Sequence, residues 1–117
     1  NKKRIWHYTI DDAEVAPTFP LKFFGYNASK ADDAVITCPT VTTSAYGVVI
    51  LGDAEEYARF IINSTGTVTL LDNSANVVAN ADTDTKLCIG TAAAQEPLQI
   101  KNRLGGVKVL NVMIWYD

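Results

Sequence analysis

The stretch that decides the fold runs from Tyr57 to Asn80 and reads Tyr-Ala-Arg-Phe-Ile-Ile-Asn-Ser-Thr-Gly-Thr-Val-Thr-Leu-Leu-Asp-Asn-Ser-Ala-Asn-Val-Val-Ala-Asn. Three short runs rich in β-branched and aromatic residues are separated by two polar clusters, residues 63–66 and 72–76. This pattern is typical of a β-meander, in which strands alternate with tight turns. Gly66 and Asn76 stand where each turn needs a residue that tolerates positive φ. The sequence therefore predicts a three-stranded meander here.

Further runs with strand character flank the meander on both sides. They cover residues 4–10, 21–26, 34–38, 46–51, 86–89, 98–102 and 107–116. We read residues 27–33 as a polar loop with a helical turn around residues 30–33. In residues 52–60 a short helix competes with a strand that begins near Tyr57. Eight to ten short strands without a long helix predict an all-β, antiparallel β-sandwich, with jelly-roll topology as the first choice.

The segment Val107–Tyr116 is the longest predicted strand. One face would carry Val107, Val109, Asn111, Met113 and Trp115, and the other Lys108, Leu110, Val112, Ile114 and Tyr116. Both faces are mostly apolar, so we expect this strand at the centre of a sheet or beneath another subunit.

Length and composition restrict the classes of protein to which the chain can belong. Its 117 residues predict a single domain, residues 1–117, and 48% hydrophobic with 20% charged residues is typical of a globular protein. The formal net charge of −3, with no basic face, argues against nucleic acid as a partner. No apolar run approaches the length of a bilayer-spanning helix, so no membrane partner is expected.

The sequence lacks the residue patterns of catalytic and metal sites. The single histidine, His7, alternates with aromatic residues and is expected to pack rather than to act as a base. Cys38 and Cys88 lie in apolar runs, which favours buried free thiols, with a disulfide as the alternative. The acidic loop at residues 79–85 lacks the glycine and the downstream glutamate of a calcium loop. We therefore predict no catalytic residue, no metal, no cofactor and no enzymatic activity.

The second half of the chain carries a resemblance. The segments concerned are Phe60-Ile61-Ile62-Asn63, Thr67-Val68-Thr69-Leu70-Leu71-Asp72, Asn76-Val77-Val78, Cys88-Ile89-Gly90, Ile100-Lys101-Asn102-Arg103-Leu104-Gly105 and Val112-Met113-Ile114-Trp115-Tyr116. Over about residues 57–117 the chain resembles small β-sandwich structural modules of tailed bacteriophage virions, of the capsid decoration or head/tail fibre type. The resemblance implies a non-enzymatic virion protein that assembles by surface complementarity with capsid or tail subunits and with itself, a homo-oligomer with a trimer favoured.

Aromatic residues near the two ends of the chain are the candidates for contact with a partner or a ligand. They are Trp6, Tyr8, Tyr26, Trp115 and Tyr116. The simpler interpretation places each of them in a core where the first and last strands meet. The more specific interpretation places some of them at a subunit interface. The alternative function is a carbohydrate-binding or adhesion module with a glycan partner. An exposed planar aromatic platform would favour sugar binding, and apolar surface at a symmetry axis would favour assembly.

Overall fold

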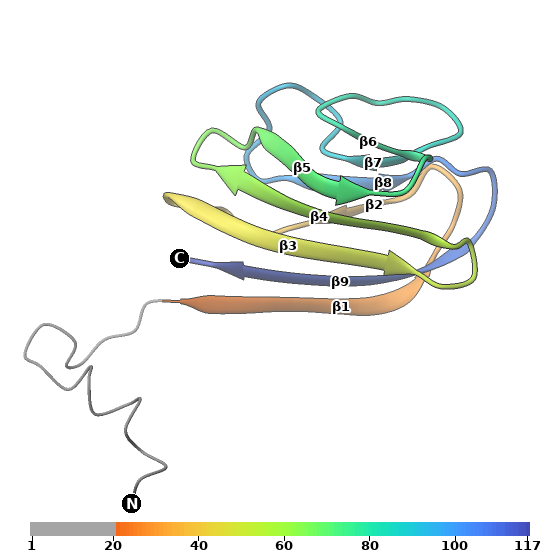
Figure 1. The fold of residues 1–117 in the computed structure, drawn as a ribbon, viewed down its shortest axis with the longest axis horizontal. Coiled ribbons are helices and arrows are strands. Elements are labelled where there is room, and N and C mark those ends of the chain that lie inside the picture. The colour runs from red at the N-terminus through yellow and green to blue at the C-terminus, as the bar shows by residue number, and fades with distance from the viewer. Residues whose placement is uncertain (1–20) are drawn as a thin grey trace, which may run out of the picture.

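The computed structural model describes residues 21–117, which form nine strands (Figure 1). The strand expected at residues 4–10, with Trp6, His7 and Tyr8, lies outside the described residues. The strands are β1 (Lys22–Lys30), β2 (Val35–Thr37), β3 (Ser44–Leu51), β4 (Glu56–Asn63), β5 (Val68–Asn73), β6 (Val77–Ala79), β7 (Leu87–Ile89), β8 (Gln99–Asn102) and β9 (Lys108–Tyr116). No helix forms in residues 21–117, and so none there is long and apolar enough to cross a membrane.

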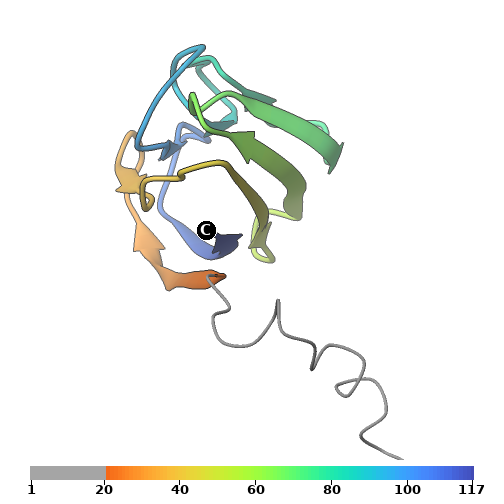
Figure 2. The same ribbon diagram turned by 90° about the vertical axis from the view of Figure 1, so that its left-hand side faces the viewer.

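The strands form two sheets. One has five strands in the order β1-β9-β3-β4-β5, which lie side by side in Figure 1, and the other has the order β2-β8-β7-β6. All pairs are antiparallel except β6 with β7. The prediction of an all-β fold is confirmed, and the two sheets are consistent with a sandwich, whose curved cross-section appears in Figure 2. The pairs β1–β9 and β2–β8 are nested as in a jelly roll, whereas β3, β4 and β5 follow one another as a meander.

The core fills the space between the sheets because alternate residues of the strands point inward. In β4 every second residue is buried, and β3 and β9 show the same alternation. The largest fully buried side chain is Phe60, and Leu51, Leu87, Leu98, Ile100 and Leu110 surround the same core. The strand β9 lies between β1 and β3, which confirms its predicted central position.

The predicted meander over residues 57–80 is correct for its first two strands and wrong for the third. The hairpin β4–β5 turns at Gly66, whose φ is +83° as its position required. The strand β6, however, pairs with β7 in the other sheet. The residue with positive φ after β5 is Asn80, at 59°, rather than Asn76. The side-chain amide of Asn80 bonds the backbone of Val68, so the start of the β5 edge is occupied without β6.

Two local predictions near β1 and β4 are also corrected or resolved. Residues 27–30, predicted as a loop, continue β1 because each pairs with a residue of β9, and Asn27 donates a side-chain hydrogen bond to Asn111. The helical turn expected around residues 30–33 is a non-helical turn instead, with Asp33 at a φ of 67°. Residues 52–55 form a turn, so the strand prevails over the competing helix and begins at Glu56.

Candidate functional site: the outer face of the five-stranded sheet

The side of the five-stranded sheet that points away from the core is unusually apolar. We call it the outer face. Its exposed large apolar residues, with their exposed fractions, are Phe23 (56%), Val109 (40%), Ile50 (42%), Tyr57 (42%), Ile61 (43%) and Trp115 (37%). The residues arise from the same alternation that fills the core, since each strand of this sheet carries apolar side chains on both faces. A partner or ligand would therefore meet a mostly apolar surface.

Strand register places three of these residues, together with the partly exposed Tyr46, in one row across the sheet. Phe23 lies opposite Trp115, Trp115 opposite Tyr46, and Tyr46 opposite Ile61. The ring centroids of Phe23 and Trp115 are 5.4 Å apart, and those of Tyr46 and Trp115 are 5.8 Å apart. The interplanar angles are 57° and 31°, so the rings pack as tilted neighbours and do not form a common plane.

Gly25 allows the ring of Phe23 to lie along the sheet. A Cβ atom at Gly25 would stand 2.9 Å from Cε2 and 3.2 Å from Cζ of Phe23. Because the glycine has no side chain, the ring covers its Cα and remains beside Trp115. Glycine at position 25 of β1 thus lets the Phe23 ring lie against the sheet at this point of the outer face.

A groove of about 420 Å³ opens along this row, from Trp115 of β9 across Tyr46 of β3 to Ile61 of β4. Apolar residues that line it include Leu21, Tyr46, Ile61 and Trp115, and polar groups at its rim come from Ser44, Asn63, Thr67 and Thr69. The groove can accept an apolar side chain or the apolar face of a small ligand, with a few hydroxyl and amide groups at its edge.

Charge on the outer face is sparse and balanced. Arg59 of β4 lies opposite Asp72 of β5, one row along from Tyr46 and Ile61. The hydroxyl of Tyr57 donates to Oδ1 of Asp72 at 3.3 Å, and the charge of Asp72 raises the pKa of Tyr57. One cation beside one anion leaves this part of the surface without net charge, although the chain carries −3.

The predicted candidate aromatics do not all share this face. Trp115 lies in the row, whereas Tyr26 and Tyr116 are half-buried and pack against the core from β1 and β9. Lysine side chains cover both rings, with Lys30 Nζ 5.6 Å from the ring centroid of Tyr26 and Lys22 Nζ 5.8 Å from that of Tyr116. Trp6 and Tyr8 lie outside the described residues.

Phe23 and Ile61 belong to the outer face but were not among the candidates. Alternation along β1 and β4 shows which side they occupy, and this part could be inferred from the sequence. Their position beside Trp115 follows from the pairing of β1 with β9 and of β3 with both β9 and β4. That pairing joins segments far apart in the chain, and no pattern in the sequence indicates it.

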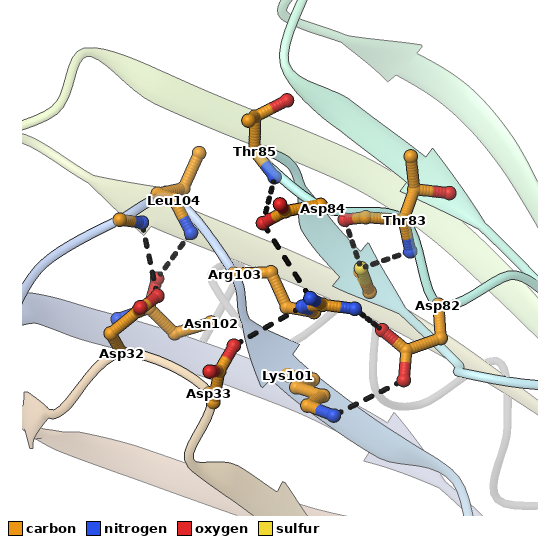
Figure 3. A network of polar contacts seen from close by, with 12 residues as sticks. Asp32, Asp33, Asp82, Thr83, Asp84, Thr85, Lys101, Asn102, Arg103 and Leu104 are labelled. Carbon is orange, nitrogen blue, oxygen red and sulfur yellow. Dashed lines mark hydrogen bonds and ion pairs between the residues drawn. The ribbon is translucent and has the colours of Figure 1, made fainter.

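A second cluster of polar residues holds the loop after β6 against β8 (Figure 3). Arg103 contacts three carboxylates, with Nε 3.1 Å from Asp33, Nη1 2.7 Å from Asp82 and Nη2 3.5 Å from Asp84. Lys101 lies 3.1 Å from Asp82, and the hydrogen bonds from Arg103 and Lys101 lower the pKa of this aspartate. The carboxylates of the acidic loop thus already have cationic partners within the chain.

Neither cysteine has the surroundings of a reactive thiolate. Both thiols are free and buried, as expected from their apolar runs. Burial, with the charge of Glu96 as a further cause, raises the pKa of Cys38 to about 12, and burial also raises the pKa of Cys88. Within residues 21–117 no three His, Cys, Asp or Glu side chains are grouped to hold a metal ion.

Comparisons with known proteins identify no relative: no protein-family model matches the chain, and no curated protein or solved structure matches it significantly.

Proposed function

We propose that this chain is a non-enzymatic structural module that buries the outer face against neighbouring proteins. The resemblance of residues 57–117 suggests the setting, a tailed-phage virion in which the chain decorates a capsid or forms part of a head or tail fibre. The observation that carries the proposal is the row Phe23–Trp115–Tyr46–Ile61 with its exposed apolar neighbours. In this proposal the neighbours are capsid or tail subunits and further copies of the chain.

The size of the apolar surface supports a contact with protein. Complete burial of a large aromatic side chain removes roughly 150–250 Å² from water. At the exposed fractions of the six outer-face residues, the apolar surface available is on the order of 500 Å². A total of this size lies within the roughly 300–600 Å² of the largest apolar patch on a typical monomer, and such a patch is often functional. The contributions of Tyr46, Val48 and Met113, which are partly exposed, enlarge it.

The groove favours a second candidate, the binding of a glycan. Trp115 and Tyr46 could pack against a sugar ring, and Asn63, Thr67 and Thr69 could hydrogen-bond its hydroxyl groups. The tilt of 57° between Phe23 and Trp115, however, leaves no extended flat platform. The mostly apolar lining also offers few partners for hydroxyl groups, so we rank this function second.

Association of the purified chain tests the proposal. We expect the wild-type mass, followed by light scattering from about 5 to 500 μM, to rise above that of one chain, and Ile61→Glu to reduce this association at least tenfold because it places an unpaired charge on the apolar face. The matched control is Thr37→Glu, which adds the same charge to an exposed position on β2 of the other sheet.

Glycan-array binding by the wild-type chain and by Trp115→Ala separates the two candidates. Absence of specific glycan binding is expected. A monomer at every concentration, together with glycan binding that Trp115→Ala abolishes, would replace the structural proposal with the carbohydrate-binding one.

A further inference from the structure

Within residues 21–117 the two sheets end in four edge strands, of which only β1 is both long and unprotected. β2 and β6 have three residues each. On β5, which has six residues, the side chain of Asn80 accepts a hydrogen bond from Val68 N at 2.9 Å and donates one to Val68 O at 2.8 Å, so the exposed backbone of Val68 is already satisfied. A register shift between Arg59 and Phe60 further bends the β4–β5 pair.

β1 has none of these protections. Its nine residues pair with β9 in continuous register, without a bulge, and contain no proline. Between Lys22 and Lys30 the sequence Phe-Phe-Gly-Tyr-Asn-Ala-Ser carries no charge. Within residues 21–117 the backbone of residues 22–29 bonds no strand other than β9, so its other edge presents free N–H and C=O groups. Proteins normally block such an edge with charges, prolines or bulges, because it is a template for another strand.

We infer that β1 pairs antiparallel with β1 of a second copy of this chain, about a two-fold axis at Gly25. This contact goes beyond the proposed function, since it uses the backbone edge and does not depend on what covers the outer face. The same strand on both partners makes the contact isologous, and because each chain has one such edge, this contact joins two copies and no more.

The side chains of β1 select this register among the symmetric alternatives. An axis at Tyr26 would pair all nine residues but place Lys22 opposite Lys30 at both ends, which like charges disfavour. An axis at Gly25 places Lys22 opposite Ala28 and leaves Lys30 beyond the paired stretch. It also sets Phe24 opposite Tyr26 twice, and aromatic pairs across strands are favourable.

The pairing would make one continuous sheet from the two five-stranded sheets. Residues that lie opposite each other in an antiparallel pair point to the same side, so the outer faces of both copies would share one side. Phe23 of each copy would lie opposite Asn27 of the other. The assembly would therefore present a doubled apolar surface, and no charged residue of β1 would lie opposite a like charge.

Thiol cross-linking tests both the contact and its register. In the double variant Phe23→Cys with Asn27→Cys, each new thiol faces the other kind of thiol across the axis at Gly25. The two thiols of one chain lie about 13 Å apart along the strand and cannot bond each other. We expect diamide oxidation to convert most of the protein into a covalent dimer on a non-reducing gel. The native Cys38 and Cys88 are buried and should not contribute.

The matched control is Phe23→Cys with Ser29→Cys, which has the same number of new thiols on the same face but pairs them only about an axis at Tyr26. We expect at least fivefold less dimer from this control. Hydrogen exchange of the wild-type chain should slow at least tenfold in β1 as concentration rises.

Three results would overturn the inference: equal cross-linking of the two variants, unchanged exchange in β1, or a wild-type mass of one or three chains. The proposed function rests on the outer face and not on the edge of β1. Association that is lost in Ile61→Glu but leaves exchange in β1 unchanged would refute the edge pairing alone. A wild-type chain that stays monomeric would also refute the edge pairing. The proposed structural function would be replaced only if the chain were monomeric and also bound a glycan in a way that depends on Trp115.

Discussion

Gly47 makes room for the largest side chain of the core. It lies opposite Phe60 in the β3–β4 pair, and a Cβ atom there would stand 2.5 Å from Cζ and 2.6 Å from Cε2 of that ring. Phe60 is fully buried in the core cluster, so in a close-packed interior its ring can move only by displacing its neighbours. We predict that Gly47→Ala lowers the free energy of unfolding by about 1–3 kcal/mol, measured by urea denaturation.

A double-mutant cycle tests this cause. Phe60→Leu removes the ring that the new methyl group would meet. The cost of Gly47→Ala should therefore fall by about 0.5–3 kcal/mol in the Phe60→Leu background. An equal cost in both backgrounds would show that the strain lies elsewhere.

Glu56 at the start of β4 is predicted to make stability depend on acid pH. Burial acts to raise its pKa, but hydrogen bonds from Ser74 Oγ at 2.5 Å and Asn76 Nδ2 at 2.8 Å hold the pKa below its ordinary value of 4.5. A carboxylate with a lowered pKa in the folded state stabilises fully above about pH 4.5, and this contribution disappears as pH falls through the folded pKa. The wild-type chain should therefore lose stability below about pH 5.

Glu56→Gln should flatten the pH dependence of the free energy of unfolding between about pH 5 and 3, and it should cost about 1–3 kcal/mol at pH 7 because hydrogen bonds to the charged group are lost. Glu55→Gln is the control, as Glu55 is exposed and adjacent. The same slope in the wild type and in Glu56→Gln would assign the acid sensitivity to other carboxylates.

At the scale of strands, the alternation of apolar and polar residues predicted where strands form. Pairing between segments far apart in the chain determines where each strand ends and which strand lies beside it. Residues 44–51, 56–63 and 108–116 are strands with the apolar periodicity that the sequence displays. Residues 27–30 look like a loop because they are polar, yet they continue β1 because β9 supplies partners for their backbone. Local propensity of a polar segment does not indicate whether a distant strand lies beside it.

The edge of β5 depends on Asn80, which replaces a neighbouring strand. Its φ of 59° turns the side chain so that one amide satisfies both the N–H and C=O of Val68. We predict a loss of about 2–4 kcal/mol for Asn80→Ala, which removes both hydrogen bonds and places alanine in the left-handed region. Asn80→Gly should cost roughly 1 kcal/mol less, since glycine tolerates this φ.

Hydrogen exchange provides the specific measurement for this edge. The amide of Val68 should exchange faster in both Asn80 variants, because it loses its acceptor in each. Unchanged protection of this amide would mean that the side chain of Asn80 does not cover the edge.

At the scale of the whole molecule, the candidate site was less predictable than the fold. The periodicity of β9 placed Trp115 on the face opposite to Leu110 and Ile114, as the structure shows. Which residues accompany Trp115 depends on the sheet order β1-β9-β3-β4, which joins residue 23 to residues 115, 46 and 61. The sequence carries no local signal for that order, so the row on the outer face emerges only in three dimensions.

Asn102 ties the two sheets together and provides a prediction for the whole fold. It is fully buried at the end of β8, and its Nδ2 donates to the carbonyl oxygens of Lys30 at 3.0 Å, Ala31 at 3.2 Å and Gly106 at 2.8 Å. Its Oδ1 accepts from Leu104 N at 3.0 Å. A side chain from β8 in the four-stranded sheet thus holds the end of β1 and the turn before β9. Both β1 and β9 are strands of the five-stranded sheet.

Asn102→Asp keeps the shape but replaces the donor with an oxygen that faces three carbonyl oxygens. We predict a loss of more than about 3 kcal/mol at pH 7, measured by urea denaturation, because one oxygen of a buried carboxylate then faces carbonyl oxygens and has no donor. Protonation of the new carboxyl group at low pH restores a donor, so part of the loss should disappear as pH falls. Asn111→Asp, at a half-buried position on the outer face, is the control. Equal costs for the two variants would contradict the role of Asn102, since the side chain of Asn111 bonds Asn27 within one sheet and does not join the two sheets.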